Sequence, residues 1–96
     1  MKLYLINTYE AQMASEQGIT ASTHEPKNTM YYTSEILEEA EVELPDGFTY
    51  EQSKCGSFEI YRGNEAADIL TVCRYGRYIT YLVTSDGRTK LHEWYY

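Results

Sequence analysis

A chain of 96 residues is long enough for one domain with one modest core, and a hydrophobic content of 43% is ordinary for a globular protein. The formal net charge of −7 disfavours direct binding to nucleic acid, because contact with phosphates requires clustered lysine and arginine. We therefore expect a single domain over residues 1–96, whose acidity reflects either a basic partner or simple solubility.

The N-terminal part begins with a predicted strand over residues 2–9. Its apolar side chains fall on both faces, which favours a central position in a sheet. Residues 10–17 predict a short helix that ends at Gly18, because glycine is common immediately after a helix. Residues 19–28 are rich in Thr, Ser, Pro and Asn and predict a loop.

Residues 33–44 are predicted to form the main helix. Thr33 or Ser34 can cap its N-terminus, and Pro45-Asp46-Gly47 ends it. Four apolar side chains fall on one helical face: Ile36, Leu37, Ala40 and Leu44. The alternation of residues 41–44 is also typical of a strand, but the helix is favoured because the apolar residues before them do not alternate.

The predicted helix is strongly acidic and contains no lysine or arginine. Six acids lie within twelve residues: Glu35, Glu38, Glu39, Glu41, Glu43 and Asp46. Residues 1–53 carry two basic and ten acidic side chains, a net charge of −8, whereas residues 54–96 carry six basic and five acidic side chains, a net charge of +1. A solvated, solubilising face explains the run, although acids four residues apart on a helix repel each other.

The functional hypothesis for this segment is a ridge that mimics the charge of a nucleic-acid backbone. Such a ridge would dock in the basic groove of a nucleic-acid enzyme, and salt would weaken the docking. The candidate partner-binding acids are Glu35, Glu38, Glu39, Glu43 and Asp46.

The C-terminal part predicts a β-meander. Residues 48–52 are expected to be extended, residues 54–56 to turn and residues 57–62 to form a strand. Three β-rich runs follow, over residues 69–74, 77–84 and 89–94. Their connections, Tyr75-Gly76 and Asp86-Gly87, predict two-residue hairpin turns, which would pair Arg74 with Arg77 and Ser85 with Arg88.

This register predicts which face of the meander is buried. The expected core face collects Leu70, Val72, Ile79, Tyr81, Val83, His92 and Trp94. Tyr78 and Tyr95 fall together on the opposite face, where they form either a patch covered by a partner or a surface covered by loops or by the N-terminal segment. We therefore predict an α+β fold in which one main helix packs on the Trp94 face of an antiparallel sheet of four or five strands.

Part of the chain resembles known small proteins. An acidic helix, the sequence Leu44-Pro45-Asp46-Gly47-Phe48, and a turn containing Gly56 before Phe58-Glu59-Ile60-Tyr61 resemble small proteins of bacterial mobile elements and phages, over about half of the chain. In size and acidity the chain is also similar to phage-encoded anti-defence proteins, including anti-CRISPR proteins. Such inhibitors share a strategy rather than a motif, so the resemblance implies a binding function, with a basic enzyme such as a CRISPR effector as partner.

Residues that could support other chemistry do not form a motif. His24, His92, Cys55 and Cys73 lack the paired spacing of zinc ligands, and the sequence contains no Gly-rich phosphate loop. Lys54 could activate the neighbouring Cys55, but no base is placed beside it. We therefore expect a protein-binding module without catalytic residues, metal or cofactor, with a homodimeric accessory domain joined through Tyr78 and Tyr95 as the alternative.

Two features of the sequence bear on its compartment. The apolar run of residues 3–6 is too short for a secretory signal, and no segment is long and apolar enough to span a membrane. We therefore expect a cytoplasmic protein with free thiols.

Overall fold

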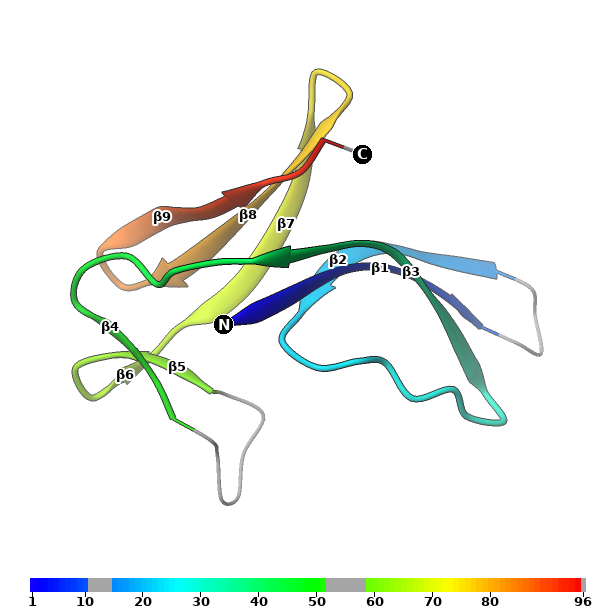
Figure 1. Ribbon diagram of the computed structural model, residues 1–96, viewed down its shortest axis with the longest axis horizontal. Helices are drawn as coiled ribbons and strands as arrows, with labels where there is room; N and C mark the ends of the chain where they lie inside the picture. Colours follow the sequence, from blue (N-terminus) through cyan, green and yellow to red (C-terminus); the bar gives the residue numbers. More distant parts are fainter. Residues whose placement is uncertain (11–14, 52–58, 96) are drawn as a thin grey trace.

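The computed structural model describes residues 1–10, 15–51 and 59–95, and these residues form strands and loops without a helix (Figure 1). The strands are β1 (Lys2–Glu10), β2 (Ser15–Ser22), β3 (Tyr32–Glu41), β4 (Phe48–Tyr50), β5 (Ile60–Arg62), β6 (Glu65–Ala66), β7 (Asp68–Arg74), β8 (Arg77–Thr84) and β9 (Gly87–Glu93). They form three antiparallel sheets: an N-terminal sheet in the order β2-β1-β3, a middle sheet β4-β5-β6, and a C-terminal sheet β7-β8-β9. The predicted α+β fold with one main helix is therefore wrong, since the described chain is all β. Nothing within the described ranges is a helix of membrane-spanning length and apolarity.

Most of the segment predicted as a helix is β3, which pairs with β1. Leu5 and Ile6 of β1 pair with Glu38 and Ile36, so that Leu37 is an extra residue on β3. Such a β-bulge interrupts the alternation of side chains. Leu37 packs against the core, whereas its neighbour Ile36 is 37% exposed. The spacing that imitates a helical face therefore comes from a bulge, and pairing with β1 overrides the local preference for a helix.

The first 28 residues are partly as predicted. The strand β1 is central in its sheet, which confirms that prediction. The helix predicted over residues 10–17 is wrong where it can be compared, because β2 begins at Ser15, and residues 11–14 lie outside the described residues. Gly18 lies within β2 with a φ of 107°, next to the register shift between Thr8 and Tyr9, and does not end a helix. The loop predicted over residues 19–28 begins only after Ser22.

The first hairpin of the meander is confirmed and the second is displaced. Arg74 pairs with Arg77 across a turn in which Tyr75 and Gly76 have φ angles of 52° and 77°. In the second hairpin Thr84 pairs with Gly87, so the loop is Ser85-Asp86, one residue earlier than predicted.

A second bulge reverses the buried face of the meander. The register shifts between Thr80 and Tyr81, which pair with His92 and Lys90 and leave Leu91 as an extra residue. Trp94 therefore lies on the same face as Thr80, and this face is buried. The predicted core face is wrong, because Leu70, Val72, Ile79, Tyr81 and Val83 are only partly buried.

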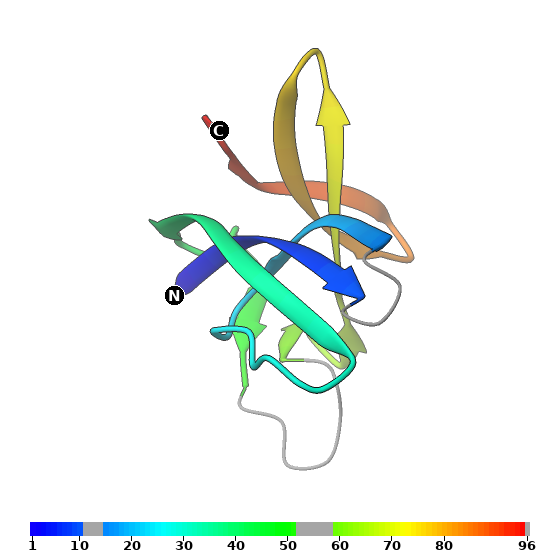
Figure 2. The same cartoon turned by 90° about the vertical axis from the view of Figure 1, so that its right-hand side faces the viewer.

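The buried face of the C-terminal sheet holds the other two sheets together. Trp94 packs in a cluster with Leu3, Leu5, Ala21 and Val42. A second cluster joins Leu82 to Phe48, Ile60 and Ala67 of the middle sheet and its flanks. The partly buried side chains of Met1, Ile69 and Leu91 touch both clusters. The two views in Figures 1 and 2 show the meander lying across the other two sheets, with β3 at the outer side of the N-terminal sheet.

The buried indole of Trp94 is also fixed by hydrogen bonds. Its Nε1–H donates to Thr80 Oγ1 at 2.9 Å, and Thr80 Oγ1 lies 2.9 Å from Thr71 Oγ1 of the neighbouring strand. Thr80 and Trp94 are both fully buried, so these bonds satisfy polar groups that have no access to water.

Candidate functional site

The predicted partner-binding acids lie on an outer strand and on the segment that follows it. We call this surface the acidic edge and define it as Glu35, Glu38, Glu39, Glu41, Glu43 and Asp46. β3 has β1 on one side and no paired strand on the other among the described residues. Figure 2 shows β3 in the foreground of the N-terminal sheet.

Only two members of the acidic edge have ion-pair partners among the residues that the structure describes. Glu39 lies 3.2 Å from Lys2 Nζ, and this hydrogen bond raises the pKa of Lys2. Glu41 lies 2.7 Å from the N-terminal amine of Met1. Since exposed ion pairs of this kind contribute little energy, both glutamates can exchange these partners for others. The acidic edge therefore keeps an excess of negative charge.

The strand distributes the acids differently from the predicted helix. Residues paired across strands share a face, so Glu39, opposite Tyr4, lies on the other face from Glu38, opposite Leu5. Glu38 is only partly exposed, and its Oε2 is buried without a hydrogen-bond partner in the described part of the chain. Glu35, Glu43 and Asp46 are exposed. Glu38 is therefore the least accessible of the predicted binding residues.

An exposed apolar group lies at the start of β3, and the sequence analysis did not identify it. We call it the tip patch; its members are exposed as follows: Met30 77%, Tyr31 56%, Tyr32 48% and Ile36 37%. The Thr29 hydroxyl accepts hydrogen bonds from the backbone N–H of Tyr31 at 3.2 Å and of Tyr32 at 3.0 Å, which fixes the turn before the strand. Tyrosine and methionine are enriched at protein interfaces, so the tip patch supplies apolar contacts beside the acidic edge. The run Met30-Tyr31-Tyr32 was its signal in the sequence.

Tyr78 and Tyr95 do not form the shared patch that their predicted register suggested. Tyr78 is half-buried and packs against the core cluster around Trp94. Tyr95 is 77% exposed, and its ring lies 5.5 Å from the guanidinium carbon of Arg77. The bulge at Leu91 causes this difference, because it moves Trp94 to the face of Tyr78 and so places Tyr95 on the other face.

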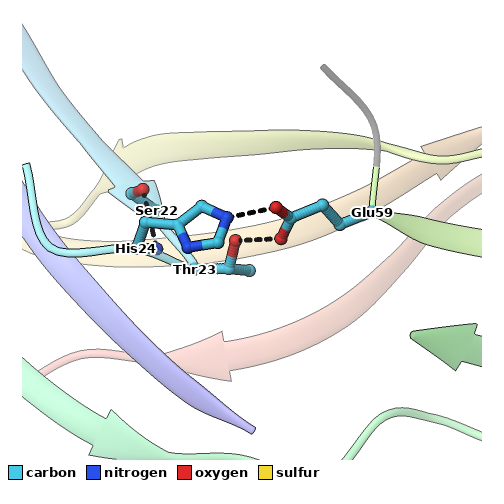
Figure 3. Close-up of polar contacts among 4 residues, drawn as sticks. All are labelled: Ser22, Thr23, His24 and Glu59. Atoms are coloured by element: carbon cyan, nitrogen blue, oxygen red, sulfur yellow. Dashed lines mark hydrogen bonds and ion pairs between the residues drawn. The ribbon is translucent and has the colours of Figure 1, made fainter. Parts of the chain in front are cut away.

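A second candidate site is a hydrogen-bonded cluster between the N-terminal and middle sheets (Figure 3). The Glu59 carboxylate accepts a hydrogen bond from Thr23 Oγ1 at 2.7 Å and is bound by His24 Nε2. The Tyr50 hydroxyl also donates to it. Thr23 and His24 follow β2, whereas Glu59 precedes β5, so one carboxylate connects the two sheets. The cluster borders a cavity of about 450 Å³ whose lining includes Ala67 and Asp68.

The three donors keep Glu59 ionised. Burial by itself would raise the pKa of Glu59, but the hydrogen bonds from Thr23, His24 and Tyr50 outweigh it and lower the pKa below its ordinary value of 4.5. In return, burial and the bond to Glu59 raise the pKa of Tyr50. Because its pKa is lowered, the Glu59 carboxylate is a weak base and is poorly suited to activate the Thr23 hydroxyl that donates a hydrogen bond to it. The cluster is therefore a hydrogen-bonded contact that links the N-terminal sheet to the middle sheet.

The cluster includes His24, one of the four side chains considered as zinc ligands. Within the described ranges no group of three or more His, Cys, Asp or Glu side chains is placed to hold a metal ion. Cys73 is an exposed free thiol on β7, and the predicted Cys55 turn lies outside the described residues.

We expect replacement of Glu59 by glutamine to lower stability at neutral pH more than in acid. A carboxylate whose folded pKa is lowered stabilises the fold above its unfolded pKa, near 4.5, and loses this contribution as the pH falls through the folded value. The loss at pH 7 should be about 1.5–3 kcal/mol, the range for hydrogen bonds to a charged group. Urea unfolding at a series of pH values measures it.

The matched control for Glu59→Gln is Glu25→Gln, which neutralises an exposed carboxylate of the segment that follows β2. It should change stability by less than about 0.5 kcal/mol at any pH. If the difference in the free energy of unfolding between the wild type and Glu59→Gln stays the same from neutral pH down through the acid range, the ionised Glu59 carboxylate does not stabilise the fold.

Comparison of the chain with protein-family models, with curated proteins and with solved structures finds no match. The choice between the two candidate sites therefore depends on their geometry. The Glu59 cluster satisfies its own polar groups, whereas the acidic edge and the tip patch present charge and apolar surface to the solvent. The surface formed by the acidic edge and the tip patch is therefore the better candidate for binding a partner.

Proposed function

We propose that this chain is a protein-binding module without catalytic activity, which acts in the cytoplasm and docks its acidic edge on a basic, nucleic-acid-binding surface of a partner enzyme. The mode of action would be that of phage-encoded anti-defence inhibitors such as anti-CRISPR proteins. The observation that supports this best is the outer position of β3, which leaves a run of exposed acids next to exposed aromatic side chains.

The extended conformation sets the acids of β3 in a row. A strand rises about 3.3 Å per residue and its side chains alternate between two faces, so neighbouring acids on one face lie about 6.6 Å apart. Glu39 and Glu41 are such a pair and Glu43 follows them in the chain, whereas Glu38 lies on the other face. Each strand of a DNA duplex carries one charge per about 3.4 Å of helix axis, so the acidic edge offers about one charge for every two phosphates.

The competing explanation is that the acids only protect the edge of the sheet. Proteins place charged side chains on outer strands to prevent pairing with other copies. This explains the glutamates of β3, but a purely protective edge would not begin with Met30, Tyr31 and Tyr32, which are all exposed. The combination of steering charge with apolar anchors is typical of a binding surface.

The test is capture of partners from a bacterial lysate at about 0.1 M and about 1 M salt, where the Debye length is about 10 Å and about 3 Å. We expect a basic nucleic-acid-binding protein that is retained at low salt and released both by high salt and by an added DNA oligonucleotide. A partner that resists both treatments would contradict the proposal. Salt-resistant self-association, measured by sedimentation, would favour the homodimeric accessory domain instead.

A further inference from the structure

The backbone of β3 has an open outer edge at its C-terminal end. Val42 N–H donates to Met1 O at 2.8 Å, and the Met1 amine donates to Val42 O at 3.0 Å, so these two residues are a hydrogen-bonded pair. In an antiparallel ladder such pairs alternate with pairs whose N–H and C=O groups point away from the partner strand. Glu41 and Glu39, one and three residues before Val42, therefore turn their backbone groups outward.

The same alternation of inward and outward backbone groups holds on the other side of the bulge. Ser34 N–H donates to Asn28 Oδ1 at 2.9 Å, which shows that Ser34 also faces away from β1. Two residues later, Ile36 faces outward by the same alternation. In the described part of the chain, the Asn28 side chain accepts a hydrogen bond from the outward N–H of Ser34. The outward backbone N–H and C=O groups of Ile36, Glu39 and Glu41 have no hydrogen-bond partner there. All three residues are exposed.

We propose that the edge of β3 from Ile36 to Glu41 binds a basic, extended segment of the partner as an added β-strand. This inference rests on the proposed binding function and adds the mode of binding and the chemistry of the segment. Main-chain hydrogen bonds supply affinity in strand addition, and alternate side chains supply specificity. The segment would place Lys or Arg beside Glu39 and Glu41 and an apolar residue beside Ile36.

Charge selects this occupant over a second copy of the chain. If β3 paired with β3 of another molecule, glutamates would lie opposite glutamates, and like charges in directly opposed positions are destabilising. Glu39 forms an exposed ion pair with Lys2, and Glu41 forms one with the N-terminal amine. The lysines of an alternating segment would instead take the place of these two partners. The acids that prevent self-pairing therefore favour a basic strand.

The experiment uses the full chain and two synthetic peptides of alternating lysine and valine. The second peptide is N-methylated at its internal backbone nitrogens, which removes the main-chain donors but keeps the side chains and the charge. We expect the unmethylated peptide to bind at low salt at least ten times more tightly. We also expect it to slow amide hydrogen exchange at Ile36, Glu39 and Glu41, the residues with outward N–H groups.

Three results would overturn strand addition. If both peptides bind equally, side-chain charge alone causes the binding, and the proposed function stands without this mode. If the unmethylated peptide does not bind at low salt, the edge does not accept a basic strand, while the lysate experiment still tests the proposed function. If the three amides are protected without peptide and more so at higher protein concentration, a second copy occupies the edge.

Discussion

Replacement of Trp94 by alanine should lower the free energy of unfolding by about 3–5 kcal/mol, the range for large-to-small changes at buried aromatic residues. Trp94 is fully buried in the cluster that joins the C-terminal sheet to Leu3, Leu5 and Ala21 of the N-terminal sheet. Its removal leaves a cavity at this contact and takes the hydrogen-bond donor from Thr80 Oγ1. Because a domain of this size has a stability of only about 5–15 kcal/mol, the variant should be close to unfolding.

Thermal unfolding followed by circular dichroism measures this effect. At about 4–8 °C per kcal/mol for a domain of this length, the midpoint should fall by roughly 12–40 °C. Tyr95→Ala is the matched control, since it truncates the adjacent aromatic residue, which is 77% exposed. Its only described aromatic interaction is with Arg77, so it should cost about 1 kcal/mol or less. Equal losses at the two positions would show that the meander does not pack on the N-terminal sheet through Trp94.

Thr80→Val separates the hydrogen bond from the packing of the indole. Valine keeps the shape of the buried threonine but removes the Oγ1 that accepts from Trp94. An unsatisfied buried donor costs about 1–3 kcal/mol. The loss should therefore be smaller than that of Trp94→Ala.

Local turn chemistry made part of the fold predictable. Tyr75-Gly76 indicates a two-residue turn, and the structure has the expected pairing of Arg74 with Arg77. The central position of β1 follows from its apolar side chains on both faces. Both predictions depend on residues that are close in sequence or buried on two sides, so no distant contact is needed to make them.

Bulges account for the two main errors. Leu37 is an extra residue opposite β1, and it gives residues 36–40 a spacing that resembles a helix. Leu91 is an extra residue opposite β8, and it moves Trp94 to the opposite face of the meander. A bulge is decided by which residues the partner strands and sheets can bury, and a period-two pattern read from one strand contains no such information. Two bulges of one residue each therefore made the predictions of the fold class and of the core wrong.

The candidate site was predictable in composition but not in geometry. The run of acids indicated a charged surface wherever the segment lay, and Glu35, Glu43 and Asp46 are exposed. The Thr23, His24 and Glu59 cluster was not foreseen, because its donors and its acceptor are separated by more than thirty residues and meet only after two sheets pack. The open edge of β3 was also hidden, since it requires knowing that this segment is a strand and that it lies at the outside.

Replacement of both Glu35 and Glu43 by lysine should weaken partner binding about 100-fold. Both side chains are exposed members of the acidic edge, and neither has an ion-pair partner within the described residues, so their reversal leaves no buried charge. Each change converts an attraction to a basic surface into a repulsion. Coupling of about 1.5 kcal/mol per close charge pair gives about 3 kcal/mol for two, and about 1.4 kcal/mol corresponds to a tenfold change. Glu38 is left intact, because its Oε2 is buried and a lysine there would also disturb the fold.

The matched control replaces two exposed acids outside the acidic edge, Glu51 and Asp68, by lysine; they too have no ion-pair partner within the described residues. Both double variants change the net charge by +4, so any effect of overall charge on the encounter rate is the same in the two. Affinity for the captured partner, measured at low and high salt, should fall only for Glu35→Lys/Glu43→Lys, and the difference between the variants should shrink at high salt. If the two variants lose affinity equally, net charge and not the acidic edge determines binding. If neither loses affinity, the acids of β3 serve to prevent strand pairing, and the tip patch around Tyr31 and Tyr32 would be the surface to alter next.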